Sequence, residues 1–346
     1  MTQEREIKKR VRNAVLSIIV GGVIVWVLIR EIDPRKILYV IGRISLWSLG
    51  ISFLLYLSSI FFKAVRFKMI LRTGISLKRL FPIVSLYTFF ANILPMRAGE
   101  LSYILLLKRQ AKTPGTKSFA SLIVSGTADV AVILAGMIGV GWHLRSVLKQ
   151  RADIFAQTAR YNLLLLAVIA VLLAAGFIAL VLLERKGLNR RHRIWKYMSF
   201  VKAKILEVAR ELADIPLDIE ILGIVACSIL IIALRFGTQW YLVRSMGIVI
   251  GIWELSFALL FGVLFSLIPI HGPAGFGTVE GPWVLILSVI LNVPREDAIA
   301  SGFALHIIII IYCVAVGVLG FSILGFRFAI SKAFVSENRK SQIRNV

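Results

Sequence analysis

The chain has 346 residues, of which 58% are apolar, and its mean hydropathy is +0.86. This balance excludes an ordinary water-soluble enzyme or binding module. A net charge of +23 would suggest nucleic acid binding in a soluble protein, but the basic residues here cluster at the ends of apolar segments. In that position they set membrane orientation and contact anionic lipid head groups. We therefore expect an all-α polytopic membrane protein with a single transmembrane domain over residues 1–346.

Six apolar segments are predicted to cross the roughly 30 Å of bilayer hydrocarbon as full transmembrane helices. In chain order they cover about 13–29, 46–65, 118–142, 161–183, 219–243 and 299–326. The first follows a basic start, as the apolar core of a signal peptide does. Because residues 27–30 offer no small-residue cleavage site, we expect it to remain as a helix.

Two further apolar regions, about 80–109 and 254–292, each contain an internal break. The residues that mark these breaks are Pro95, Gly99 and Glu100 in the first, and Pro273, Gly275, Gly277 and Glu280 in the second. Proline and glycine interrupt helices, and a carboxylate is costly in hydrocarbon, so each break should be buried in protein or line a wet cavity. Breaks in corresponding positions of two halves predict a transport site.

The basic residues also predict how the chain crosses the membrane. They cluster near the N-terminus, in the C-terminal tail and in residues 63–79, 108–117 and 185–216. If all five clusters are cytoplasmic, the first broken region enters and leaves on the cytoplasmic side and the second on the outer side. Both regions are therefore predicted to be re-entrant hairpins, inserted from opposite faces of the cell membrane. Both termini are expected in the cytoplasm, and residues 185–216 as a basic amphipathic helix on the inner leaflet.

The two halves, residues 10–143 and 160–327, contain short similar strings. Residues 64–67 read Ala-Val-Arg-Phe, and residues 233–236 read Ala-Leu-Arg-Phe. Arg66 would lie near the cytoplasmic end of an inward span, and Arg235 near the outer end of an outward span. The repeats are therefore predicted to be inverted, as in many secondary transporters. Strings this short can also match by chance in a sequence of biased composition.

Charged residues near the breaks are candidate ligands of a substrate. Arg97 and Glu100 fall at the tip of the first hairpin, where free backbone N–H groups and a guanidinium could hold a phosphate. Glu280 follows three glycines that allow the backbone to approach a ligand closely. Both carboxylates could instead cap the broken helices or pair with an arginine, although Ser or Thr would cap without a charge.

Asp129 and Arg235 lie within predicted spans, where an isolated charge costs at least about 2.5–3.5 kcal/mol. We therefore expect Asp129 to pair with a basic residue, either Arg97 or Arg235; a purely structural ion pair is the alternative. His271 could relay protons, because an unperturbed imidazole titrates near neutral pH. It could equally be a hydrogen-bonded structural group.

Several kinds of site are not expected. Cys227 and Cys313 are the two cysteines, and each lies in an apolar run, so neither a disulfide nor a metal site is predicted. The sequence contains no GxSxG, HExxH or P-loop motif, so no cofactor is expected and a transporter is favoured over an enzyme. Without an ATP-binding loop, transport would be driven by gradients, by substrate concentration or by a partner protein.

Three elements in the same order resemble the flippase-like membrane family, which includes the membrane half of lysylphosphatidylglycerol synthases. They are Lys-Ala-Val-Arg-Phe at 63–67, Leu-Pro-Met-Arg-Ala-Gly-Glu at 94–100 and the Pro/Gly-rich run 269–280. The resemblance covers about residues 10–328 and implies movement of a phospholipid or polyprenyl-linked lipid between leaflets. His271 and Ala274 stand where this family usually has Ser and Gly, which leaves the lipid undefined. No counterpart of the soluble aminoacyl-transfer domain is present, so lipid aminoacylation is not expected.

The leading prediction is a lipid flippase whose substrate head group occupies a polar cavity between the hairpins. Its predicted partners are membrane lipids, including anionic lipids at the cytoplasmic face, and a lipid-modifying enzyme. The candidate substrate-binding residues are Arg97 and Arg235 for the phosphate, Glu100, Glu280 and Asp129 for the cavity or a cationic head group, and His271 and Arg66. Two alternatives stay open: a membrane enzyme or accessory subunit in lipid-linked glycan or head-group assembly, and a scaffold that binds lipid without moving it.

Overall fold

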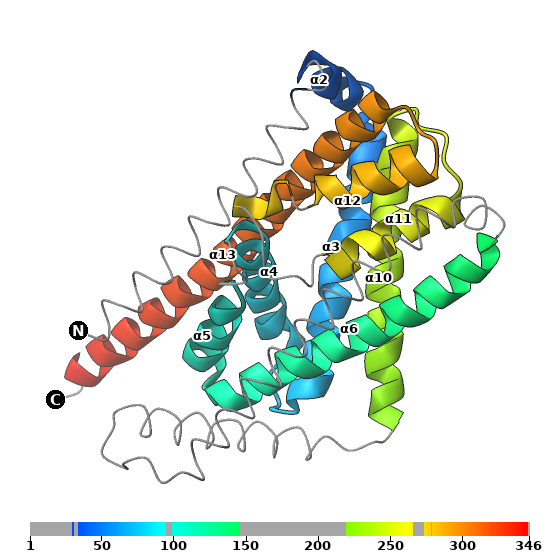
Figure 1. Ribbon diagram of the computed structural model, residues 1–346. Coiled ribbons are helices and arrows are strands. Elements are labelled where there is room, and N and C mark those ends of the chain that lie inside the picture. Colours follow the sequence, from blue (N-terminus) through cyan, green and yellow to red (C-terminus); the bar gives the residue numbers. More distant parts are fainter. Residues whose placement is uncertain are drawn as a thin grey trace, which may run out of the picture.

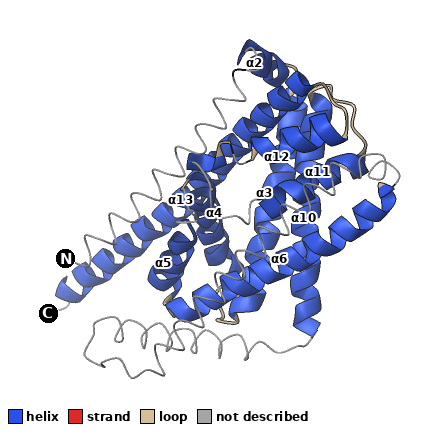
Figure 2. Ribbon diagram, in the orientation of Figure 1, coloured by secondary structure: helices blue, strands red, loops and turns tan. Residues whose placement is uncertain are grey.

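The computed structural model describes residues 30, 34–94, 99–145, 219–265, 273–277 and 279–344, with backbone alone at 34, 219, 264–265, 273 and 326–344. Throughout this part the regular elements are helices, and no strand occurs in it (Figure 2). The predicted spans at 13–29 and 161–183 and the predicted amphipathic segment 185–216 lie outside the described residues.

Four long helices correspond to the other four predicted spans. They are α3 (Leu46–Leu71), α6 (Gly115–His143), α10 (Ile219–Ser245) and α13 (Arg295–Arg344). Each contains a stretch long and apolar enough to cross a membrane, which in α13 covers Arg295–Gly325. These four spans are therefore confirmed as helices of the required length and composition.

Pairs of shorter helices occupy both broken regions. The first pair is α4 (Leu77–Ile93) and α5 (Gly99–Ala111); the second is α11 (Ile252–Phe265) and α12 (Glu280–Val284), the latter continued by the π-helical turn η3 (Leu285–Ile290). At 1.5 Å per residue, α4, α5 and α11 are each about 20–26 Å long, less than the roughly 30 Å of bilayer hydrocarbon. Both halves thus repeat one order of helices, long, short, short and long.

The two halves meet along α3 and α10, which lie side by side and antiparallel (Figure 1). At one end, Arg72 directly after α3 places Nε 2.6 Å from Oε2 of Glu220 in the first turn of α10. At the other end, the backbone of Gly247 just after α10 lies against the guanidinium of Arg43, which precedes α3. Because α4 follows α3 and α11 follows α10, the two short-helix pairs open toward opposite ends of this central pair.

The short helix α2 (Pro34–Gly42) precedes α3 and contacts the start of α13. The Lys36 ammonium lies 2.9 Å from a carboxylate oxygen of Glu296 and 2.9 Å from one of Asp297. The hydrogen bonds to Glu296 and Asp297 raise the pKa of Lys36. This contact is exposed, so it positions α2 without adding much stability.

A glycine face on α13 packs against α4. A Cβ atom at Gly317 would lie 2.6 Å from the Phe89 side chain, and a Cβ at Gly320 would lie 2.9 Å from the carbonyl oxygen of Pro82. Small residues allow helices in membranes to approach until their backbones touch. The first half therefore contributes α4 to the packing of the second half's last helix.

Replacing Gly320 with alanine should lower the free energy of unfolding by about 1–3 kcal/mol, because the added methyl group meets backbone that can move only with the whole helix. Gly325, on the same helix, has no atom within 4 Å of the position that an added methyl group would take, so Gly325→Ala should be neutral or slightly stabilising. Unfolding of both variants in mixed micelles measures the difference. Equal stability of the two would contradict the close packing of α4 on α13.

Candidate functional site

A cavity of about 480 Å³ lies where the two short-helix pairs meet. Its wall is formed by α4, α5 and α6 of the first half and by α10, α11, α12, α13 and the turn η2 (Pro273–Gly275) of the second half. Most of the lining is aliphatic or aromatic. The charged, imidazole or amide side chains in the lining belong to Asn92, Glu100, Asp129, Arg235, Gln239 and His306.

The cavity brings together three of the predicted site residues, Glu100, Asp129 and Arg235. Two others, Arg66 and Glu280, lie behind its wall, each bonded to a residue that lines it. Arg97 and His271 lie outside the described residues. Side chains from both halves of the sequence thus share one chamber.

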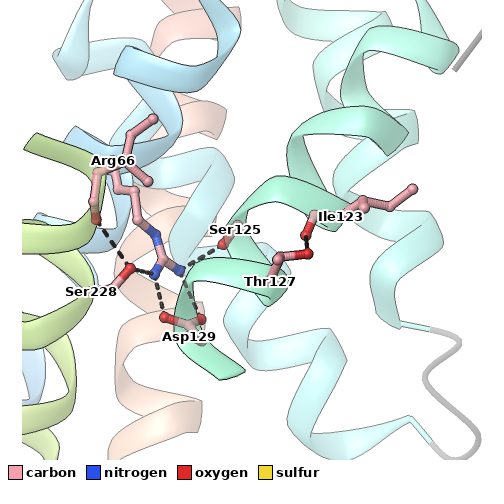
Figure 3. Close-up of polar contacts among 7 residues, drawn as sticks. Arg66, Ile123, Ser125, Thr127, Asp129 and Ser228 are labelled. Atoms are coloured by element: carbon pink, nitrogen blue, oxygen red, sulfur yellow. Dashed lines mark hydrogen bonds and ion pairs between the residues drawn. The ribbon is translucent and has the colours of Figure 1, made fainter. Parts of the chain in front are cut away.

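A buried ion pair supports the first-half side of the cavity. Arg66 on α3 is 1% exposed, and its guanidinium bonds both carboxylate oxygens of Asp129 on α6, with Nη2 3.0 Å from Oδ2. The same guanidinium donates to Ser125 Oγ and Ser228 Oγ, each at 2.6 Å (Figure 3). Because Ser228 belongs to α10, one side chain joins three long helices.

The prediction that Asp129 pairs with a basic residue is confirmed. Of the two expected partners, Arg235 was wrong, and Arg97 lies outside the described residues. The ion pair is with Arg66. Asp129 keeps 33% of its side chain exposed and forms part of the cavity wall, whereas Arg66 is hidden behind it. The helix α6 is steeply tilted against α3, so a residue's distance along its own span does not predict which charge it meets (Figure 1).

Arg235, the counterpart of Arg66 in the second half, has a different environment. Its side chain is exposed and lines the cavity. Among the described residues, no carboxylate lies within ion-pair distance of it. Gln239 lies one helical turn further along α10 and lines the same cavity, so an amide and a guanidinium face the chamber together.

The second-half side of the cavity contains a buried carboxylate and an imidazole. Glu280 is 0% exposed at the start of α12, and its Oε2 accepts the Gly277 N–H at 2.8 Å. This bond is a helix-capping contact of the kind considered from the sequence. The other oxygen, Oε1, lies 2.6 Å from Nδ1 of His306 on α13, and Nε2 of His306 lies 3.0 Å from the carbonyl oxygen of Ala274. His306 was not predicted as a site residue, although a buried Glu280 requires a partner.

The turn that His306 holds has an unusual backbone. Ala274 has φ 54°, Gly275 has φ 80° and Gly277 has φ 85°, all in the left-handed region. That region costs an L-residue other than glycine roughly 1–2 kcal/mol. Ala274 therefore occupies a glycine-type position, and the hydrogen bond from His306 to its carbonyl helps to hold it there.

Glu100 lies in the first turn of α5, where a carboxylate is stabilised by the helix dipole. The start of α5 is tightly packed, since a Cβ at Gly99 would lie 2.3 Å from the Ala91 backbone of α4. The close contact of these two helices places Glu100 at the cavity beside Asn92 and Leu94.

Replacing Asp129 with alanine should destabilise the protein by about 3–5 kcal/mol, because the buried Arg66 charge is left uncompensated. Combining Arg66→Met with Asp129→Leu should recover most of that loss, since neither charge then remains. The matched control is Glu220→Ala, which breaks an exposed α3–α10 ion pair and should cost no more than about 1 kcal/mol. Denaturant unfolding in mixed micelles measures all three; an Asp129→Ala protein as stable as the Glu220→Ala protein would contradict a structural role for the buried pair.

The sequence matches a family model. The model of the lysylphosphatidylglycerol synthase TM region matches residues 14–317. Among curated proteins, the comparison finds no match. The matched range contains both short-helix pairs and every described residue that lines the cavity. The protein is therefore a member of the family defined by the lysylphosphatidylglycerol synthase TM region.

Proposed function

We propose that this protein moves a lipid with an anionic, phosphate-bearing head group between the leaflets of the cell membrane. The head group occupies the cavity between the halves while the acyl or prenyl tails stay in the bilayer. Family membership supports a membrane role, and the cavity has the size and location of a small polar ligand site between repeats.

In this proposal the short-helix pairs are re-entrant hairpins inserted from opposite faces, and the chain has six full spans with both termini in the cytoplasm. The helix lengths support it, because α4, α5 and α11 are too short to cross the hydrocarbon. The opposite directions in which the pairs open also support it, since an inverted repeat requires that arrangement.

The observation that carries the proposal is Arg235, a cation that faces the cavity without a carboxylate partner among the described residues. Asp129 is already neutralised by Arg66, and Glu280 is bonded to His306. A guanidinium in a mostly apolar chamber is stabilised by binding an anion, and its planar donors suit the oxygens of a phosphate.

The remaining predicted residues fit around this contact. Gln239 supplies an amide next to Arg235, and Glu100 on the first-half wall could attract a cationic group elsewhere on the head group. Arg97 and His271 stay candidate contacts from the two hairpin tips. Arg66 acts indirectly, by holding Asp129 in the wall.

Leaflet exchange of a fluorescent phosphatidylglycerol in phosphatidylglycerol–phosphatidylethanolamine vesicles tests the proposal. The wild-type protein should accelerate exchange, measured as the fraction of label that dithionite reduces. Arg235→Ala should slow it by roughly tenfold to a hundredfold, since a hydrogen bond to a charged group contributes about 1.5–3 kcal/mol.

The matched control is Arg244→Ala. Arg244 lies on the same helix but stacks on Trp240 at the end of α10 and does not line the cavity, so its loss should leave exchange unchanged. Equal rates with wild-type protein and with empty vesicles, or an Arg235→Ala protein as fast as wild type, would refute phosphate binding at Arg235 during lipid movement.

A further inference from the structure

The hydrogen bonds of His306 determine how many protons the Glu280–His306 pair carries. Nε2 faces the Ala274 carbonyl oxygen at 3.0 Å, and a carbonyl can only accept, so Nε2 carries a hydrogen. Nδ1 faces Glu280 Oε1 at 2.6 Å, and two bare acceptors would repel each other at that distance. One proton must therefore lie between them, either on Nδ1 of an imidazolium or on Oε1 of a carboxylic acid.

The second carboxylate oxygen limits where that proton can be. Oε2 of Glu280 accepts the Gly277 N–H at 2.8 Å, so it acts as an acceptor there. Both arrangements of the remaining proton give the Glu280–His306 pair a net charge of zero. Neutrality matters because Glu280 is 0% exposed and an unpaired buried carboxylate would carry a large desolvation penalty.

We propose that Glu280 and His306 form a proton-binding site, and that its proton latches the second hairpin turn onto α13. The role of this proton site in transport rests on the proposed lipid movement. When the cavity opens at this wall, the pair releases the proton to water, and when the cavity closes, the pair binds a proton again. A proton is thus the coupling ion of the transporter.

Loss of the proton has a defined structural effect. The pair becomes a buried anion, and the one ring hydrogen that remains can bond either Glu280 Oε1 or the Ala274 carbonyl oxygen, but not both. With the hydrogen on Nδ1, the Ala274 carbonyl, whose residue has φ 54°, loses its donor. With the hydrogen on Nε2, two acceptor atoms face each other 2.6 Å apart. In either case the strained turn loses one of its two bonds to His306. Ala274, Gly275 and His306 all line the cavity, so the released segment is part of the cavity wall.

The surroundings allow this site to respond to the occupant of the cavity. Arg235 of α10, Asp129 of α6 and Glu100 of α5 are the charged groups that line the same chamber. The lining residues of α11 are apolar. Of the α4 residues that line the cavity, Asn92 alone is polar, and its amide is neutral. The Phe276 ring, 4.7 Å from the imidazole, covers His306, which is 7% exposed. An anionic head group at Arg235 would neutralise the positive charge that lines this chamber and favour retention of the proton.

Hydrogen–deuterium exchange of peptides covering residues 273–280, in phosphatidylglycerol nanodiscs between about pH 5 and pH 9, tests the latch without any lipid movement. Labelling times are scaled for intrinsic exchange. The wild-type turn should be protected at low pH and lose protection by at least about tenfold above one transition, as deprotonation breaks the latch.

Two variants separate proton binding from a merely structural bond. Glu280→Gln keeps all three hydrogen bonds, because the introduced amide N–H donates to Nδ1 and its oxygen accepts the Gly277 N–H, but it has no proton to lose. Its turn should stay protected at every pH. His306→Ala should be unprotected at every pH. His143→Gln, at the end of α6 against Trp253, should retain the wild-type transition.

The outcomes also distinguish this inference from the proposed function. A wild-type turn without a transition, or the same transition in Glu280→Gln, would refute the proton site even if the protein moves lipid. A transition that Glu280→Gln abolishes, in a protein that moves no lipid at any pH, would uphold the proton site and refute lipid transport. If both hold, leaflet exchange should depend on pH in the wild type and lose that dependence in Glu280→Gln.

Discussion

The Arg66 guanidinium is the interaction on which the arrangement of the long helices depends. It is 1% exposed and bonds α6 through Asp129 and Ser125 and α10 through Ser228. In hydrocarbon a bare guanidinium is strongly unfavourable, so α3, α6 and α10 must keep the relative positions that satisfy it. The cavity wall that contains Asp129 is therefore held in place by Arg66, a buried residue that does not itself line the cavity.

The two arginines in the similar strings at 64–67 and 233–236 have different environments. Arg66 is neutralised and buried, whereas Arg235 faces the chamber and has no carboxylate partner in the described part of the chain. If Arg66 and Arg235 had the same environment, either both guanidinium groups or neither would have a carboxylate partner. Among the described residues, the difference leaves one cation without a carboxylate partner in the cavity lining, and the proposed function rests on its preference for an anion.

Much of the fold could be predicted from the sequence, because apolar length alone identifies spans such as Leu46–Leu71 and Pro/Gly breaks alone identify interrupted helices such as α4 and α5. The convergence of Glu100, Asp129 and Arg235 followed from the cost of charge in hydrocarbon. The pairing of charges could not be predicted, because helix tilt sets which residues meet: Asp129 met Arg66, and Glu280 met His306. A single imidazole in an apolar helix resembles a packing residue until its neighbours are known.

The contact of α4 with the glycine face of α13 has a consequence for how the molecule is assembled. The first half supplies the helix that covers Gly317 and Gly320 of the last helix, while α3 and α10 tie the halves together at their centre. Each half thus buries part of its packing surface only against the other half. A separated second half would leave the glycine face of α13 without the helix that covers it, and a separated first half would leave α4 uncovered, so we expect neither half to fold alone.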